Sequence, residues 1–168
     1  VKFGSYYETK DDFENMTKYY LMAIDNKNSD AMIKLGTYYE TKDDFENMIK
    51  YYLMAIDSAQ RKNSNAMNLL GVYYKKKNDE ENMLKFYLMG VENGNSNSMH
   101  NLGLYYHKKN DEVNMLKFYL MGVENGNSKS MHNLGLYYHK KNDEENMLKF
   151  YLMGVENGDS DAMCNLGV

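Results

Sequence analysis

The chain has 168 residues, of which 43% are hydrophobic and 26% are charged, and its formal net charge at pH 7 is −4. This composition is typical of a foldable, soluble chain with enough apolar residues for a substantial core. No run approaches the roughly 18 consecutive apolar residues of a membrane span. The net negative charge argues against phosphate-driven binding of nucleic acid. A single cysteine, Cys164, excludes an internal disulfide framework and is compatible with a reducing intracellular compartment.

A Leu-Gly pair recurs along the whole chain. It occupies residues 35–36, 70–71, 102–103, 134–135 and 166–167, and Phe3-Gly4 takes the same place at the start. Successive glycines are therefore 32 residues apart, except for one interval of 35. We interpret the extra residues, between Ser58 and Asn63, as a lengthened loop. A period of this length is typical of repeat architectures such as solenoids.

The repeats predict one array over residues 1–168. We expect a partial repeat at 1–28, complete repeats at 29–63, 64–95, 96–127 and 128–159, and a partial repeat at 160–168. The chain begins and ends in the middle of a repeat, so we expect it to be part of a longer array. Further repeats or self-association would then cover the apolar helix faces at both ends.

Each repeat is predicted to be a pair of helices. Ser29 is a suitable N-cap, and Met32, Leu35, Gly36 and Tyr39 follow it on one helical face. The same serine recurs at Ser64, Ser96, Ser128 and Ser160. Glycine in the middle of a helix costs about 1 kcal/mol relative to alanine. We therefore expect another helix to pack closely against Gly36.

A turn at Asp43-Asp44 precedes the second helix, which is predicted over residues 45–57. Asp43 and Glu46 have the spacing of a capping box. Since this helix is apolar on nearly all sides, we expect neighbours to enclose it and to leave a narrow exposed stripe at Glu46 and Lys50. The glycines expected to end the later copies in the left-handed conformation are Gly94, Gly126 and Gly158. The sequence thus predicts an all-α solenoid of antiparallel helix pairs, with first helices lining the concave face.

This pattern resembles the tetratricopeptide repeat superfamily and, within it, the Sel1-like repeat. Segment Gly94–Gly122 reads G-xxx-S-xxx-L-G-xx-Y-xxxx-D-xxx-M-xx-F-Y-xx-G, and the resemblance extends over essentially the whole chain. Asn114-Met115 replaces the Lys-Ala pair of the Sel1-like pattern. The glycine-rich loop of Sel1-like units and the closing proline of tetratricopeptide units are both missing. The resemblance implies a non-catalytic scaffold or adaptor for a protein or peptide.

Basic and hydrogen-bonding side chains gather on the predicted first helices of the later repeats. His100 and His107 lie on one helix face, about 10 Å apart along the axis, which is too far for two ligands of one ion. The lysines that end these helices either complement the helix dipole or make the groove basic, which would suit an acidic peptide. The residues that we expect to bind a partner are Asn68, Val72, Lys75, Lys76, His100, Leu104, His107, Lys108, His132, Leu136, His139 and Lys140.

Other functional classes have less support. The second tyrosine of tandem pairs such as Tyr38-Tyr39 has core spacing, so we expect packing rather than base stacking and no nucleic-acid partner. No Ser/His/Asp order, phosphate loop or metal-spaced cluster is present, and Cys164 has no arranged base. An enzyme is therefore the least expected class, and we expect no cofactor. The alternative to a scaffold is a structural or assembly component that packs through its ends and faces.

Overall fold

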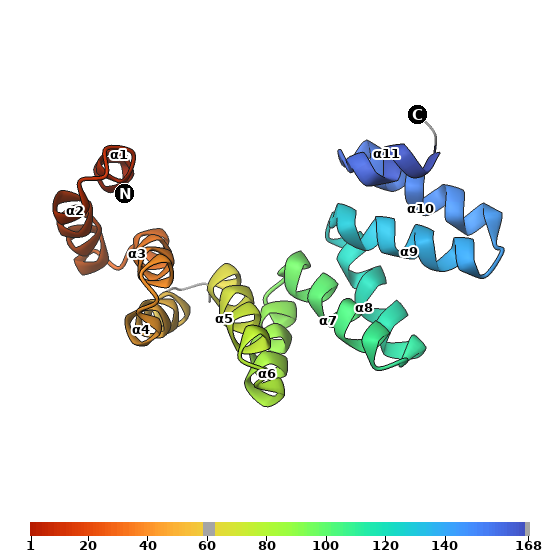
Figure 1. Cartoon of the computed structure of the whole chain (residues 1–168), viewed down its shortest axis with the longest axis horizontal. Coiled ribbons are helices and arrows are strands. Elements are labelled where there is room, and N and C mark those ends of the chain that lie inside the picture. Colours follow the sequence, from red (N-terminus) through yellow and green to blue (C-terminus); the bar gives the residue numbers. More distant parts are fainter. Residues whose placement is uncertain (59–62, 167–168) are drawn as a thin grey trace. The chain divides into compact units, whose positions relative to one another are not determined.

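The computed structural model of the protein describes residues 1–58 and 63–166, and its regular structure there is α-helical (Figure 1). The helices are α1 Lys2–Glu8, α2 Phe13–Asp25, α3 Ser29–Thr41, α4 Phe45–Asp57, α5 Ser64–Lys76, α6 Glu80–Glu92, α7 Ser96–Lys108, α8 Glu112–Glu124, α9 Ser128–Lys140, α10 Glu144–Glu156 and α11 Ser160–Leu166. None of these helices is long and apolar enough to cross a bilayer. The lengthened loop predicted around residues 59–62 lies outside the described residues.

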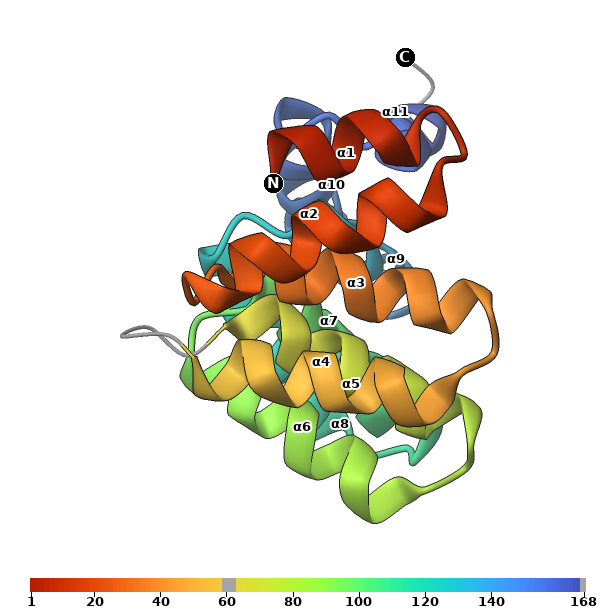
Figure 2. The same cartoon turned by 90° about the vertical axis from the view of Figure 1, so that its left-hand side faces the viewer.

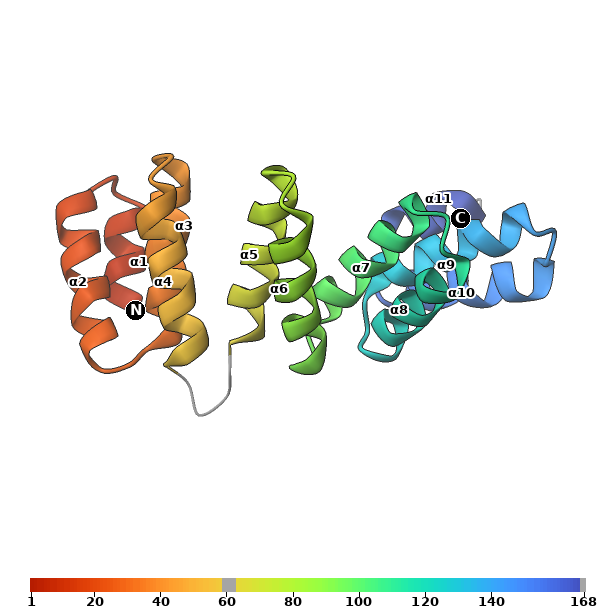
Figure 3. The ribbon, with the colours of Figure 1, turned by 90° about the horizontal axis from the view of Figure 1, so that it is seen from below.

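The chain separates into two compact units, Val1–Phe86 (unit 1) and Tyr87–Val168 (unit 2), and the division falls within α6. In unit 1, consecutive helices contact one another from α1 to α5, and Figure 2 shows α1 to α4 in chain order. In unit 2, consecutive helices from α7 to α11 are in contact, and α7 also touches α9 (Figure 3). The predicted all-α solenoid of paired helices is confirmed.

The glycine of each Leu-Gly pair lies where a tyrosine of the partner helix packs. A Cβ atom built on Gly36 would lie 2.6 Å from a ring carbon of Tyr52, which is only 1% exposed. The same close approach joins Gly4 to Tyr20, Gly103 to Tyr119 and Gly135 to Tyr151. The prediction that a neighbouring helix packs closely at Gly36 is confirmed, because only a residue without a side chain leaves room for this ring.

The N-caps of α3, α5, α7 and α9 are asparagines, and Asp159 accepts the amide hydrogen bonds at the start of α11, so the prediction of serine caps at Ser29 and its equivalents is wrong. Ser29 is already helical, and Asn28 before it has extended backbone angles (φ −76°, ψ 107°). The Asn28 Oδ1 atom accepts a hydrogen bond from the Ala31 amide at 2.9 Å. The equivalent caps are Asn63, Asn95 and Asn127. Asparagine and serine cap about equally well, so adjacent candidates could not be ranked from residue type alone.

The second helices are capped by an aspartate one residue later than predicted. Asp43 has left-handed backbone geometry (φ 55°), and Asp44 caps α4. Asp44 accepts from the Asn47 amide at 3.1 Å and from Asn47 Nδ2 at 2.8 Å. The capping box expected between Asp43 and Glu46 is therefore wrong, and an Asp-Asn pair takes its place. The left-handed glycines are confirmed, with φ of 75°, 72° and 78° at Gly94, Gly126 and Gly158.

The second helices are less enclosed than predicted. In α4 the expected stripe at Glu46 and Lys50 is exposed, but it continues onto Leu53, which is 39% exposed. The equivalent exposed leucines are Leu21, Leu88, Leu120 and Leu152. Each second helix thus presents an apolar side chain on its outer stripe.

The second tyrosine of each tandem pair packs inside its own repeat. Tyr39 stacks on Tyr51 with ring centroids 5.5 Å apart and planes 3° from parallel. The equivalent stacks are Tyr7–Tyr19, Tyr74–Phe86, Tyr106–Phe118 and Tyr138–Phe150. The prediction that these rings pack within the fold is confirmed.

Candidate partner-binding site

In unit 1, a glutamate near the end of α1 and another near the end of α3 are bound by the repeats themselves. The Tyr52 hydroxyl donates a hydrogen bond to Glu40 Oε2 at 3.3 Å and lies 3.2 Å from Thr37 Oγ1. Lys76 Nζ, from the next first helix, pairs with Glu40 at 3.3 Å. One repeat earlier, Glu8 accepts from Tyr20 at 2.8 Å and pairs with Lys34 at 3.6 Å. A carboxylate is thus held by a buried tyrosine and a lysine of the following repeat.

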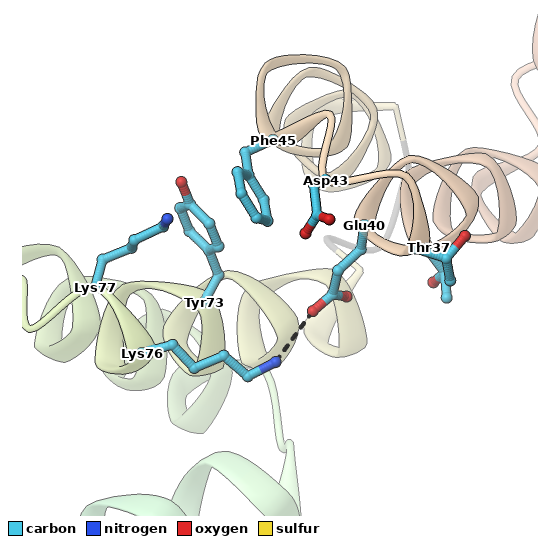
Figure 4. A pocket seen from close by; sticks show the side chains of 8 residues that line it. Thr37, Glu40, Asp43, Phe45, Tyr73, Lys76 and Lys77 are labelled. Atoms are coloured by element: carbon cyan, nitrogen blue, oxygen red, sulfur yellow. Dashed lines mark hydrogen bonds and ion pairs between the residues drawn. The ribbon is translucent and has the colours of Figure 1, made fainter.

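A hollow of about 520 Å³ lies beside the Glu40 contact, between the α3–α4 turn and α5 (Figure 4). Lys76 reaches toward Glu40, as the dashed line in Figure 4 shows. Lys77 Nζ lies 4.3 Å from the centre of the Phe45 ring, and that ring lies 5.5 Å from Tyr73. Glu40, Lys76 and Lys77 therefore already have contacts within unit 1.

Unit 2 carries different residues at the same positions of the repeat. Counted from the Leu-Gly pair, Leu104 replaces Thr37 and His107 replaces Glu40. Tyr119 is buried (1% exposed), and its Oη atom has no hydrogen-bond partner among residues 1–58 and 63–166. Burial raises the pKa of the Tyr119 hydroxyl to about 12. The hydroxyl therefore stays protonated at neutral pH and is a buried donor without an acceptor in the described part of the chain.

A hollow of about 70 Å³ adjoins this tyrosine, and we call it the Tyr119 hollow. It is lined by His107, Met115, Tyr119, Asn133, Leu136, Tyr137 and Lys140. All of these residues belong to α7, α8 and α9 of unit 2. The lining combines apolar side chains with the polar groups of His107, Tyr119, Asn133 and Lys140, so it can receive a small polar group.

Glu112, the acidic group next to this hollow, is already bound. The Tyr137 hydroxyl donates a hydrogen bond to Glu112 Oε1, and Lys141 Nζ lies 3.1 Å from the same carboxylate. The hydrogen bond from Tyr137, followed by that from Lys141, lowers the pKa of Glu112. Its negative charge is thus matched by Lys141, and Lys140 is a separate cation that lines the hollow.

Another hollow of unit 2, of about 200 Å³, is lined by His100 and His132 together with Lys129, Asn133, Asp159 and Asp161. Both histidines are half-buried against a tyrosine: His100 lies 6.0 Å from Tyr119 and His132 6.0 Å from Tyr151, between ring centroids. The His132 Nδ1 atom is buried and has no hydrogen-bond partner in the described part of the chain. Within that part, no group of three His, Cys, Asp or Glu side chains could hold a metal ion.

The residues predicted to bind a partner are distributed over both units. Asn68, Val72, Lys75 and Lys76 belong to α5 in unit 1, and the others belong to α7 and α9 in unit 2. His107, Leu136 and Lys140 meet at the Tyr119 hollow. Leu104 instead packs against a core cluster that includes Tyr119. Lys108 and His139 are exposed near the ends of α7 and α9.

Tyr119 and Asn133 line the hollow but were not among the predicted residues. A signal for Tyr119 exists in the sequence: Thr37 and Glu40 are both replaced in the repeat that contains Leu104 and His107, while the tyrosine is kept. That signal becomes informative only when the helix pairing shows that these three positions meet.

Two segments of the chain, residues 29–61 and 128–156, match the family model described as Tetratricopeptide repeat. A Sel1 repeat protein from Oxalobacter formigenes superposes with a TM-score of 0.79 and 24% identity, covering 99% of this chain and 75% of its own. A protective antigen of uropathogenic Escherichia coli strains, displaying an SLR fold, has a TM-score of 0.73 and 19% identity over 90% of this chain and 35% of its own. YrrB, a TPR protein with an unusual peptide-binding site, has a TM-score of 0.57 and 15% identity over 100% and 90%. None of the curated proteins matches the sequence.

Proposed function

Because the chain is built from repeats of the tetratricopeptide and Sel1-like family, whose fold commonly mediates protein–protein interaction, we propose that it is a non-catalytic scaffold that binds a protein or peptide. The partner would lie along the first helices, which we expect to form the concave face of the array. One observation carries the proposal: the Tyr119 hollow presents polar groups of α7 and α9, whereas Glu40 and Lys76 in unit 1 bind each other.

The chemistry of these helices favours an acidic segment with apolar side chains as partner. Lys140 supplies positive charge, Asn133 and His107 supply hydrogen bonds, and Leu136 supplies apolar contact. YrrB, which shares the fold, carries a peptide-binding site, and this supports a peptide as the class of ligand.

Co-purification with the full chain tests this function. The four-histidine variant removes the imidazoles of α7 and α9, and it carries His100→Ala, His107→Ala, His132→Ala and His139→Ala. The matched control carries Lys50→Ala, Lys85→Ala, Lys117→Ala and Lys149→Ala at one repeated, exposed position of the second helices. We expect the histidine variant to lose a specific partner at unchanged helicity and the lysine variant to keep it. Retention by both variants would contradict binding through the first helices.

A role as an assembly component is the second candidate, and the exposed leucines of the second helices favour it. Leu53 and Leu120 occupy the same repeat position in different units, and both are exposed. Exposed apolar side chains are typical of protein–protein contact surfaces where they gather into a patch. If the chain self-associates through these leucines, Leu53→Ser with Leu120→Ser will convert oligomers to monomers in sedimentation velocity, and the four-histidine variant will not.

A further inference from the structure

We propose that a second copy of this chain binds to unit 2 through helix α8, in an antiparallel pair of α8 helices. We call the contact surface on each copy the α8 stripe, and its residues are Val113, Lys117, Leu120 and Glu124. The inference rests on the second candidate function, self-association through the second helices, and it assigns that function to one helix. It is independent of what the first helices bind.

The first observation is a residue that distinguishes α8 from the other second helices. Repeats 96–127 and 128–159 differ at only three positions, and one of them is Val113, which corresponds to Glu145. The remaining second helices also have glutamate at this position, namely Glu14, Glu46 and Glu81. The Val113 side chain is 78% exposed, so it adds almost nothing to the core. Valine is also a weaker helix former than glutamate, so the replacement does not favour α8 itself.

The second observation is that Val113 belongs to a continuous exposed face. The residues of the α8 stripe follow one another at intervals of four, three and four positions, which places them along one side of a helix. All of them are exposed, and Leu120 is 40% exposed. The buried residues of α8 lie on the other side, and they are Met115, Phe118, Tyr119 and Gly122. The α8 stripe is therefore accessible to a partner and contains two apolar and two charged side chains.

The third observation concerns those two charges. Lys117 Nζ lies 5.3 Å from the centre of the Phe118 ring, and no carboxylate pairs with it among residues 1–58 and 63–166. In the other second helices the equivalent lysine follows a glutamate by four positions, which is the spacing of a stabilising ion pair, and Val113 removes that glutamate from α8. Glu124 is seven residues beyond Lys117, or about 10 Å along the axis, which is too far for a pair on one helix. An acidic partner for Lys117 can therefore come from another molecule.

An antiparallel pair of α8 helices supplies that partner. In the register that places Glu124 of the second copy opposite Val113, Leu120 of the second copy lies opposite Lys117. The aliphatic part of Lys117 then packs along this leucine. Its ammonium group lies one helical turn from Glu124 of the second copy, within reach of an ion pair. Two-fold symmetry forms every contact twice, because each copy uses the same surface.

The same register is unfavourable for the other second helices. In α10, Glu145 would lie opposite Glu156 of the second copy, and in α4, Glu46 would lie opposite Asp57. Like charges that meet across an interface suppress the wrong pairing. Val113 removes this repulsion in α8. Because one helix pair is smaller than a typical stable interface, we expect a dimer that dissociates in the micromolar range.

Sedimentation velocity of the full chain over a range of concentrations measures this dimer. Val113→Glu restores the residue of the other repeats, and we expect it to weaken the dimer at least about tenfold. We expect the same of Leu120→Ser. Leu152→Ser changes the same repeat position in α10, and this matched control should remain within about twofold of the original chain. Equal weakening by Leu120→Ser and Leu152→Ser would overturn the assignment to α8.

Exchanging the two charges tests the antiparallel contact. Lys117→Glu and Glu124→Lys each replace an attraction by a repulsion, and we expect each to weaken the dimer about tenfold. The two changes together restore the ion pair with its signs reversed, so the combined variant should be within about threefold of the original chain. Circular dichroism of each variant verifies that helicity is unchanged. A combined variant in which the two losses simply multiply would contradict the contact between Lys117 and Glu124 of the second copy.

The surface can also be transferred to α10. Helices α8 and α10 have the same sequence except at Val113 and Glu145. In a chain that already carries Val113→Glu, we therefore expect Glu145→Val to restore the dimer through α10. A double variant that stays monomeric at concentrations where the original chain is dimeric would contradict the role assigned to this position.

These measurements separate the inference from the proposed functions. If Leu53→Ser removes the dimer and Val113→Glu does not, the α8 site is overturned and assembly through other second helices stands. A chain that remains monomeric up to about 1 mM overturns both. The scaffold function is decided separately by the four-histidine variant, because its substitutions lie on α7 and α9 and should leave the dimer intact.

Discussion

Tyr52 and Glu40 form a hydrogen bond inside unit 1, with 3.3 Å between the tyrosine Oη and the carboxylate Oε2. Tyr119 occupies the same repeat position in unit 2 and is equally buried, but its hydroxyl has no partner in the described residues. The two tyrosines pack against equivalent glycines, Gly36 and Gly103. The two tyrosines therefore have equivalent positions against a glycine and equal burial, and their hydroxyls differ in hydrogen bonding among the described residues.

Removing the hydroxyl will have different effects at these two positions. Tyr52→Phe breaks a hydrogen bond to a carboxylate, and we expect it to lower the free energy of unfolding by about 1 kcal/mol. Tyr119→Phe removes a buried donor that has no acceptor among residues 1–58 and 63–166, so we expect no loss or a small gain in stability. Urea denaturation of both variants measures the difference. Equal losses would show that the Tyr119 hydroxyl already has an acceptor, such as a bound water.

The repeat period and the helix pairs could be predicted from the sequence because they depend on spacing alone. The Leu-Gly period predicted both helices of each repeat, and α4 begins and ends at the predicted residues, Phe45 and Asp57. The caps were placed one residue away from their true positions, at Ser29 instead of Asn28 and at Asp43 instead of Asp44. Adjacent residues of similar capping strength are distinguished by backbone angles, which residue type does not determine.

The candidate site could be predicted only in part. His107, Leu136 and Lys140 were found because basic and apolar residues repeat along the first helices. Tyr119 was missed because its position in the second helix is typical of a core residue, and it is indeed buried. Tyr119 is a candidate because His107 lines the same hollow and stands at the repeat position of Glu40. That relationship depends on how α7 and α8 pack together.

Gly36→Ala will destabilise unit 1. The added Cβ atom would lie 2.6 Å from the Tyr52 ring, and that ring is enclosed and has little room to move. Overpacking of this kind costs about 1–3 kcal/mol. Alanine's higher helix propensity returns about 1 kcal/mol. Because the enclosed ring cannot move aside, we expect a cost near the upper end of the range and a net loss of stability. Thermal denaturation followed by circular dichroism is the measurement.

A double-mutant cycle identifies the cause of that loss. If the clash with the ring is responsible, Gly36→Ala combined with Tyr52→Ala will be more stable than the sum of the two single effects predicts, by about 1 kcal/mol or more. Additive effects would instead attribute the loss to the backbone of α3.

Stability of the array will fall as the solution is acidified, because aspartates cap the second helices. In the folded protein the side-chain hydrogen bond from Asn47, followed by the one from its backbone amide, lowers the pKa of Asp44. The pKa of Asp143 is lowered in the same way by Asn146. A carboxylate with a lowered folded-state pKa contributes stability that is complete above its unfolded pKa and is lost as the pH falls through the folded value. We therefore expect melting temperatures to decrease as the pH falls below about 4.

Replacing these caps with asparagine separates their contribution from that of other acidic groups. Asp44→Asn and Asp143→Asn keep a side-chain acceptor of similar capping strength but do not titrate. The first helices already use this residue, for example at Asn28. We expect the double variant to lose less stability than the original chain between neutral and acidic pH. Parallel pH curves for the two proteins would contradict this assignment.

The contacts between successive repeats will respond differently to salt in the two units. In unit 1, Phe45 packs on Tyr73 and lies under Lys77, whereas in unit 2 its counterpart Glu112 binds Tyr137 and Lys141. We expect Glu112→Gln to destabilise the protein at low salt and to have little effect at 1 M salt, where screening acts within about 3 Å.

Phe45→Leu should cost about 0.5–1.5 kcal/mol at both salt concentrations, because most of its contact is apolar. Urea denaturation at the two concentrations compares them, and an equal salt dependence of the two losses would contradict the ionic character of the unit 2 contact.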